Sequence, residues 1–332
     1  MNEGIRNTIS SMARPMKLER LISWSGQKNI FPFYHTVSPE PLPHISHLYR
    51  VLKPAEFEED LDKLLLFFEP LSLGDYLENR GGGRTKPNMV LTFDDGLKEC
   101  YDFIAPLLKK KGVPATFFLN NKFIDNRGLF YRYKASLLIH QLRNDCRSKE
   151  KVAAFLKISE EQVETSVRMI GWDQRALLEA LAVEAELDFA GYLRSRPVYM
   201  NSNEVEDILE WGFDIGAHSS DHVDFTSLDA SEMNQQVKAS VEDLQKRFGV
   251  HTAYFSFPFT SDGVPGEVID SLLEEGTASA LLGTAGLKRT GKWSYIQRIP
   301  MEKYEMPALE TLKAEYLSYL LKMPLGRNRL RQ

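Results

Sequence analysis

Residues 89–96 read Met-Val-Leu-Thr-Phe-Asp-Asp-Gly, an apolar run that ends in two carboxylates and a glycine. The apolar part predicts a buried strand over residues 89–93. Adjacent residues of a strand point to opposite faces, so Asp94 and Asp95 can serve one site only if the backbone turns there. Gly96 permits such a turn. Two carboxylates held close repel each other and favour a cation beside them; a simple turn that caps the next helix is the alternative interpretation.

Apolar and amphipathic segments alternate on both sides of this stretch. The predicted strands cover residues 29–35, 89–93, 115–119, 213–217, 253–257 and 278–282. The predicted helices cover residues 54–68, 97–111 with a kink or break at Pro106, 203–211, 231–248 and 266–275. This alternation indicates an α/β protein with a parallel sheet, either open or closed into a barrel, and helices outside it. Functional side chains of such sheets gather beyond the carboxyl ends of the strands, where His35, Asp94, Asp95 and His218 are expected.

Residues 126–200 interrupt the alternation. They are rich in Leu, Ala, Glu, Lys and Arg, and they predict helices over 131–143, 149–156, 159–170 and 174–195. We interpret them as a helical insertion between two strands of the sheet.

The composition restricts the class of protein. The chain has 332 residues, of which 43% are hydrophobic and 26% charged, with a net charge of −5. This balance gives no reason to expect nucleic acid as a partner. No apolar run reaches the roughly 18 residues of a membrane span, and residues 1–28 lack the apolar core of a secretory signal. We therefore expect a cytoplasmic protein.

Two terminal segments flank the predicted sheet. Residues 1–28 are expected to form an N-terminal arm, and residues 307–332 an amphipathic helix with a tail. The tail carries the basic residues Arg327, Arg329 and Arg331. A solvated terminal helix is one interpretation, and weak contact with an anionic membrane surface is the other.

The segment His218-Ser-Ser-Asp-His222 holds two histidines at positions i and i+4. On one face of a helical turn, this spacing allows both imidazoles to reach one metal ion, although two surface histidines would show the same pattern. Combined with Asp95 they make a three-ligand set that leaves positions for water and substrate. Asp94 is then free to act as a base, which favours metal-assisted hydrolysis of an acyl group.

Both motifs resemble a known family. Thr-Phe-Asp-Asp-Gly at 92–96 followed by His-Ser-x-x-His at 218–222 is similar to the first two motifs of the NodB-type polysaccharide deacetylases, carbohydrate esterase family 4. The stretches at 114–119 and 212–218 also match the family's phrasing, and the resemblance covers about residues 29–125 and 201–300.

This resemblance implies a distorted (β/α) barrel, here over residues 29–306 around the insertion 126–200. It also implies one divalent metal, usually zinc, and removal of acetyl groups from N-acetylated sugars of a polysaccharide or its precursor. O-acetyl groups remain an alternative. Carried over by position, Asp94 is the catalytic base, and the metal ligands are Asp95, His218 and His222.

Two departures from the family pattern concern the later motifs. The Arg-x-Pro-Tyr-Gly motif is replaced by Ser256-Phe-Pro-Phe-Thr260, so the arginine that steadies the base is missing. The final Leu-x-His motif has no counterpart near residues 280–300. Arg298 is a candidate for the missing positive charge, with a plain surface arginine as the alternative. The predicted substrate contacts are Pro258, Phe259, Arg298 and Tyr34.

Phe33-Tyr34-His35 resembles the Leu-x-Tyr-His motif of the circularly permuted branch that deacetylates poly-N-acetylglucosamine. There this histidine is the general acid that protonates the departing amine. The resemblance therefore implies that role for His35, against a core or capping histidine.

Other aromatic and histidine residues allow weaker interpretations. His44 and His47 are expected to pack or to line a substrate groove, because no nearby acid completes a metal set. Tyr131 and Tyr133 open the insertion and suit either stacking on sugar rings or a helix core.

Two other functions compete with the deacetylase. Ser256 and Thr260 suggest a catalytically weak carbohydrate-binding relative of the same fold, whereas retention of Asp94 argues for catalysis. A non-haem iron oxygenase also uses two histidines and one carboxylate, but its His-x-Asp spacing is absent here.

Overall fold

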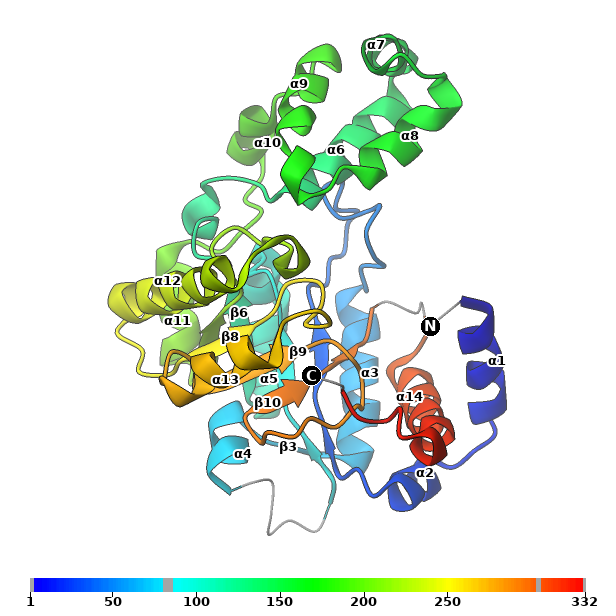
Figure 1. Cartoon of the computed structure of the whole chain (residues 1–332), viewed down its shortest axis with the longest axis vertical. Helices are drawn as coiled ribbons and strands as arrows, with labels where there is room; N and C mark the ends of the chain where they lie inside the picture. The colour runs from blue at the N-terminus through cyan, green and yellow to red at the C-terminus, as the bar shows by residue number, and fades with distance from the viewer. Residues whose placement is uncertain (1–2, 80–85, 303–305, 331–332) are drawn as a thin grey trace.

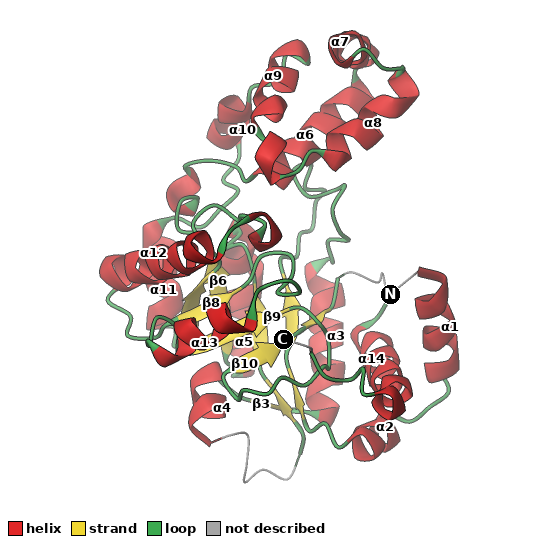
Figure 2. Cartoon of the chain, in the orientation of Figure 1, coloured by secondary structure: helices red, strands yellow, loops and turns green. Residues whose placement is uncertain are grey.

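The computed structural model describes residues 3–79, 86–302 and 306–330. At its centre, eight parallel strands form one sheet in the order β10-β9-β8-β7-β6-β5-β2-β11. Their bounds are β2 Pro32–Tyr34, β5 Leu91–Phe93, β6 Ala115–Leu119, β7 Asp214–Ala217, β8 Tyr254–Ser256, β9 Ala280–Gly283, β10 Tyr295–Gln297 and β11 Ile299–Pro300. Figure 2 shows the strands at the centre of the lower body with helices around them.

The two edge strands of this sheet, β10 and β11, follow each other directly in the sequence. β10 pairs with β9 and β11 pairs with β2, and only Arg298 lies between β10 and β11. The sheet therefore curls until its two edge strands lie on either side of Arg298, and this nearly closed sheet confirms the predicted distorted (β/α) barrel. The sequence pattern predicts no strand at 295–300, because the polar Gln297 and Arg298 interrupt it. Both side chains are nevertheless buried, so polar groups take core positions here.

Helices outside the barrel connect the strands. Their bounds are α3 Pro54–Phe67, α5 Ala105–Lys111, α11 Ser202–Glu210, α12 Ala230–Phe248 and α13 Gly266–Glu274. Capping fixes the ends of α12: Asp229 and Glu232 bond to each other's backbone N–H at its start, and Gly249 ends it at φ 64°. The predicted break at Pro106 takes the form of a π-helical turn, Cys100–Ile104, before α5.

Two of the predicted strands divide between the barrel and a smaller sheet. The N-terminal part of segment 29–35 is β1 (Asn29–Ile30), and that of segment 89–93 is β4 (Asn88–Met89). They form a three-stranded parallel sheet with β3 (Glu69–Pro70), in the order β1-β4-β3. The helix α4 (Leu73–Asn79) follows β3.

The helices between residues 131 and 195 stand away from the barrel, at the top of Figure 1. Their bounds are α6 Tyr131–Asn144, α7 Cys146–Leu156, α8 Glu160–Met169, α9 Ala176–Glu184 and α10 Phe189–Ser195. The single helix predicted over 174–195 is wrong, because the chain breaks between α9 and α10 with Glu186 at φ 52°. The N-terminal end of α6 begins near the barrel and places aromatic residues there.

The two termini pack together beside the barrel. Residues 1–28, for which no regular element is predicted, contain α1 (Glu3–Ala13) and α2 (Leu18–Ser25). The helix α14 (Ala308–Lys322) packs against α1, α2 and α3 (Figure 1). Within the described ranges, no helix has both the length and the apolar character required to cross a bilayer. Arg331 lies outside the described residues, and membrane-surface contact through the tail stays a prediction.

Candidate active site

Asp94 and Asp95 follow β5 at the carboxyl end of the barrel. The backbone N–H of Asp94 still bonds to the Tyr34 carbonyl of β2 at 2.9 Å, as in the strand ladder. The chain then turns sharply, with Asp95 at φ 73° and Gly96 at φ 68°. A Cβ on Gly96 would lie 2.9 Å from the Leu119 side chain, so glycine is required there both for its φ and for space. The predicted turn is thus present, and both carboxylates reach one site.

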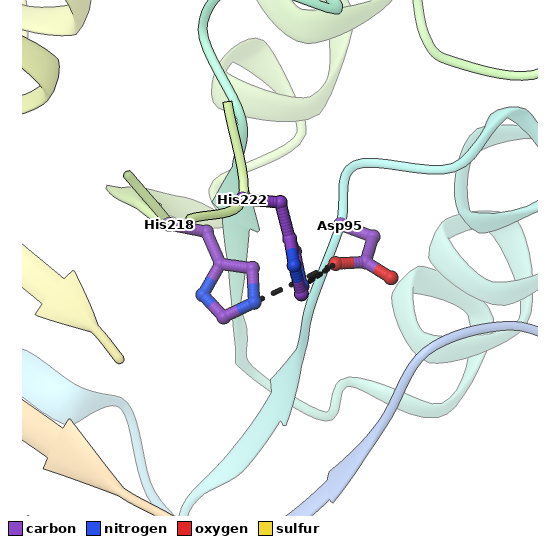
Figure 3. A group of neighbouring side chains, drawn as sticks. All are labelled: Asp95, His218 and His222. Carbon is purple, nitrogen blue, oxygen red and sulfur yellow. Dashed lines mark ion pairs between the residues drawn. The ribbon is translucent and has the colours of Figure 1, made fainter. Parts of the chain in front are cut away.

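Asp95, His218 and His222 are buried side chains whose potential ligand atoms all lie within 4.8 Å of one another. Oδ1 of Asp95 is 3.1 Å from Nε2 of His222 and 3.5 Å from Nε2 of His218. Figure 3 shows the three side chains pointing toward a common centre. The sequence pattern therefore selected three residues that meet in space.

A loop after β7, not a helical turn, brings the two histidines together. Ser219 and His222 adopt positive φ values of 61° and 55°, and the segment between the histidines is not helical. The expectation of a helical i, i+4 pair is therefore wrong, although the rings still lie 4.9 Å apart between centroids. An amide of Asn120 bonds to the carbonyl of His218 and fixes the start of this loop.

His218 is held in one tautomer. Its Nδ1 lies 2.8 Å from the carbonyl oxygen of Ser256, which can only accept, so Nδ1 carries the proton. Burial lowers the pKa of His218 to about 4, which keeps the ring neutral at neutral pH. The Nε2 lone pair therefore faces Asp95, as a metal ligand requires.

The two carboxylate oxygens of Asp95 differ, because only one of them accepts a hydrogen bond. Oδ2 accepts a 2.7 Å hydrogen bond from the hydroxyl of Tyr133, at the start of α6. Oδ1 is buried without a hydrogen-bond donor. Burial by itself raises the pKa of Asp95, but the neighbouring His222 overrides it and holds that pKa well below its usual range. An ionised oxygen facing two imidazole nitrogens, with no donor of its own, fits a divalent cation.

Asp94 forms a buried ion pair with Arg298. Nη1 and Nη2 of Arg298 donate to Oδ1 and Oδ2 of Asp94, each at 2.7 Å. Arg298 also donates to Thr92 at 2.9 Å and to the hydroxyl of Ser256. Burial raises the pKa of Asp94, and the Arg298 charge more than offsets this, so the net shift is downward. The interpretation of Arg298 as a surface arginine is wrong, because its side chain is 0% exposed.

His35 follows β2 on another side of the same cavity. Its Nδ1 lies 2.5 Å from Oε2 of Glu302, and its backbone N–H donates to Oε1 of the same residue at 2.9 Å. The ring stacks on Tyr49 with centroids 4.4 Å apart. Burial lowers the pKa of His35, but the Glu302 carboxylate outweighs it and raises that pKa to about 9. His35 is therefore cationic at neutral pH.

These groups line a cavity of about 740 Å³. Phe259 is part of its wall, and its ring packs edge-on against His222 with centroids 4.6 Å apart. Pro258 is buried beside it. Tyr34 and Arg298 were predicted as substrate contacts, but both are buried, at 1% and 0% exposure, and neither lines the cavity. Tyr34 instead packs against Phe57 and Phe93.

Sequence reasoning missed Glu302 and Tyr49. Glu302 follows β11, so it obeys the same rule as His35, Asp94 and His218: it stands just past a strand end. Because no strand is predicted at 295–300, the position of Glu302 just past a strand end could not be recognised from the sequence. Tyr49 lies in a loop with no pattern to distinguish it. Of the weaker candidates, His44 is buried and bonded to Tyr192 at 2.8 Å, whereas His47 lines the cavity.

A nearly closed β/α barrel with acids and imidazoles at the carboxyl ends of its strands is the architecture of a barrel enzyme. The family model described as polysaccharide deacetylase matches residues 81–268. The chain belongs to the polysaccharide deacetylase family, because this match covers more than half of its length. It is thus a hydrolytic deacetylase, and its substrates are acetylated sugars.

Solved structures share this fold at low sequence identity. IcaB from Ammonifex degensii is 15% identical with a TM-score of 0.54, over 87% of this chain and 96% of that chain. The deacetylase PplD of Streptococcus pyogenes, solved with acetate, is 13% identical with a TM-score of 0.56, over 86% of this chain and 97% of that one. A de-N-acetylase from Aggregatibacter actinomycetemcomitans is 13% identical with a TM-score of 0.52, over 86% and 99%. The comparison with curated proteins found no match. Kinship with the circularly permuted branch stays a prediction.

Proposed function

We propose that this chain is a zinc-dependent N-deacetylase of an N-acetylated sugar in a polysaccharide or its precursor. One observation carries the proposal: the cluster of Asp95, His218 and His222 shares one cavity with an arginine-paired Asp94 and a glutamate-paired His35. A set of potential metal ligands, a base and an acid thus share one cavity. Arg298 pairs with the base, and Glu302 pairs with the acid.

Asp95, His218 and His222 are the residues that would hold the metal. Two neutral imidazole nitrogens and one carboxylate oxygen form the donor set of many catalytic zinc sites. Bound there, the ion would polarise the acetyl carbonyl and lower the pKa of water. The cavity beside the cluster leaves room for both water and the acetyl group.

Asp94 is the proposed general base. Its lowered pKa keeps it ionised at neutral pH, so it can accept the proton of the attacking water. Arg298 holds both carboxylate oxygens and fixes their direction. Arg298 therefore does in this chain what the family's motif arginine, replaced here by Ser256, is expected to do.

His35 is the proposed general acid. An amide nitrogen leaves only after it has been protonated, because an amide anion is a very poor leaving group. His35 carries the needed proton at neutral pH, since Glu302 raises its pKa to about 9. An acid prepared in this way favours N-acetyl over O-acetyl substrates. The weak-binding alternative has no observation in its favour, because Arg298 supplies the charge that Ser256 lacks.

A chelator experiment tests the metal and the reaction together. Acetate release should be measured on a panel of N- and O-acetylated glycans, before and after the metal is removed and zinc restored. We expect release from an N-acetylated member, loss of at least 90% of it with the chelator, and recovery with zinc. Full turnover after complete metal removal would reject the metal-dependent mechanism.

Asp94→Asn separates the roles of the two acids. We expect the variant to keep its zinc and to lose about a hundredfold or more in kcat, the usual scale for a general base. Metal content and kcat are measured on one preparation. Asp102→Asn, which changes an exposed carboxylate paired with Lys98, is the matched control. Loss of zinc together with activity would make Asp94 a ligand.

His35→Ala tests the acid. The variant should slow deacetylation of an N-acetyl sugar much more than hydrolysis of an activated acetyl ester, whose leaving group needs no proton. The ratio of the two kcat values, variant against wild type, gives the answer. Equal losses on both substrates would place the acid elsewhere.

A further inference from the structure

One part of the cavity wall is cationic. Arg132, Arg143 and Arg168, from the helices α6 and α8, line it together with Arg50 from the loop before α3. None of these residues belongs to the proposed catalytic machinery. Three of them lie on the side of the cavity that the helical insertion forms. The metal-ligand cluster (Asp95, His218 and His222) lies at the strand ends.

The charges of this wall are only partly balanced. Glu164 bonds to Arg143 at 2.7 Å and lies 3.9 Å from Arg168, and Glu56 bonds to Arg50. Within the described parts of the chain, Arg132 pairs with no carboxylate. Four guanidinium groups therefore face two carboxylates, an excess of two positive charges.

The acids at the base of the cavity do not make up this difference. Asp94 is already taken by Arg298, and Glu302 by His35. Asp95 faces the two imidazoles of the proposed metal site. The excess positive charge of the wall is thus not paired with the acids at the base of the cavity.

Hydrogen bonds to the backbone hold two of the four arginines in place. Arg168 donates to the carbonyl of His47 at 3.0 Å, and Arg132 donates to the carbonyl of Arg168 at 2.7 Å. The Arg132 guanidinium also lies 5.9 Å from the ring centre of Phe259, which itself packs on His222. Arg132 is thus a preorganised cation that one aromatic ring separates from the metal-ligand cluster.

We propose that the substrate is an anionic acetylated glycan, whose phosphate or carboxylate group binds to Arg132, Arg143, Arg168 and Arg50 while its acetyl group reaches Asp95, His218 and His222. This inference rests on the proposed function and adds its substrate class. Guanidinium groups pair with both oxyanions through two parallel hydrogen bonds, so phosphate and carboxylate share the recognition chemistry. A cavity of about 740 Å³ has room for a sugar together with such a group.

Two matched pairs of compounds test the proposal. The first pair is N-acetylglucosamine 1-phosphate against methyl N-acetylglucosaminide. The second is a tetrasaccharide of alternating glucuronate and N-acetylglucosamine against tetra-N-acetylchitotetraose, with acetate release expressed per acetyl group. Acetate release gives kcat/KM for each compound, and calorimetry gives Kd. We expect the anionic member of at least one pair to be preferred at least tenfold in both measurements. A preference in the first pair identifies phosphate as the bound group, and a preference in the second pair identifies carboxylate.

Arg132→Gln supplies the residue-level test. We expect the ratio of anionic to neutral kcat/KM to fall at least tenfold through KM, because one charged hydrogen-bond partner typically accounts for a factor of that size. Arg132→Lys, which keeps the charge but not the two-pronged geometry, should recover part of it. Arg194→Gln is the matched control, because Arg194 lies in the same insertion, pairs with Asp188 and does not line the cavity.

The two proposals fail in different ways. Equal kcat/KM and equal Kd for both members of each pair would overturn the anionic substrate and leave the deacetylase intact. Anionic compounds that bind through Arg132 but release no acetate would support the cationic subsite and count against the proposed function. An unchanged ratio in Arg132→Gln would also overturn the subsite.

Discussion

Arg298 and Asp94 are buried charges that depend on each other. A buried carboxylate whose partner is removed is left uncompensated, at a cost of about 3–5 kcal/mol. Replacement of both partners by uncharged side chains avoids most of that cost. Because Arg298 also lies between the edge strands β10 and β11, its ion pair links the proposed catalytic base to the stability of the whole sheet.

We expect Arg298→Met to lower the free energy of unfolding by about 3–5 kcal/mol, and Arg298→Met/Asp94→Asn to recover a large part of it. Urea unfolding of the two single variants and the double variant gives the coupling energy. Losses that simply add would mean that the two side chains are energetically independent.

The Glu302 carboxylate raises the pKa of His35 and so keeps its imidazole protonated at neutral pH. A cationic acid stays protonated below its folded-state pKa. If His35 is the proposed acid, activity is therefore expected at neutral pH and its loss is expected as pH rises through about 9. Glu302→Gln removes the charge that raises this pKa, while the burial that lowers it remains. The falling limb of kcat/KM should therefore move to lower pH.

The pH profile of Glu302→Gln is measured against wild type between pH 6 and 10. Glu204→Gln is the matched control, since Glu204 bonds to Lys98 away from the cavity. A falling limb at the same pH in Glu302→Gln and wild type would show that another group sets it.

At the scale of elements, α6 connects the helical insertion to the active site. Tyr133 at its first turn bonds to Asp95, and Phe130 just before it stacks on His222 with ring centroids 4.2 Å apart. The hydroxyl of Tyr133 also lies 3.2 Å from that of Tyr49, whose ring stacks on His35. The insertion therefore supports both the proposed metal ligands and the proposed acid.

Tyr133→Phe should weaken zinc binding about ten- to a hundredfold, the usual effect of losing a hydrogen bond that orients a ligand. Competition with a chelator measures the affinity. Tyr192→Phe is the control, because it removes one tyrosine hydroxyl from the same insertion, at His44 and away from the metal ligands. Equal zinc affinities in Tyr133→Phe and wild type would limit Tyr133 to packing.

At the scale of the whole molecule, the terminal helices make one layer beside the barrel. Leu312 of α14 is fully buried, whereas Leu321 on the same helix is 50% exposed. The packing of α14 against α1, α2 and α3 joins the N-terminal and C-terminal helices to a helix that covers the barrel. We therefore expect the terminal helices and the barrel to unfold together.

Leu312→Ala should lower the free energy of unfolding by about 2–5 kcal/mol and keep a single transition. Leu321→Ala should change it by about 0.5 kcal/mol or less. Urea unfolding followed by tryptophan fluorescence and by circular dichroism distinguishes the two outcomes. A separate early transition in Leu312→Ala would show that the terminal helices fold independently.

Local patterns in the sequence were sufficient for six of the eight barrel strands and for the clustered residues Asp95, His218 and His222. A strand such as 115–119 is predicted from its own apolar residues, and the residues around Asp95 and His218 form short contiguous motifs. Such signals depend on neighbours within a few positions, which a single sequence displays directly. The strands within residues 295–300 were not predicted, because their segment contains the polar residues Gln297 and Arg298. These side chains are buried through contacts with residues distant in the sequence.

Only the tertiary structure decided which distant charges meet. Asp94 and Arg298 lie 204 positions apart, and His35 and Glu302 lie 267 apart. The arginines of the insertion likewise line the cavity only because the packing of α6 and α8 places them there. Each pairing depends on where barrel closure and helix packing place the side chains, and no local pattern of hydrophobicity or spacing encodes that position. The sequence by itself therefore determined the chemistry available, while the folded chain determined the partners that set the charge and direction of each group.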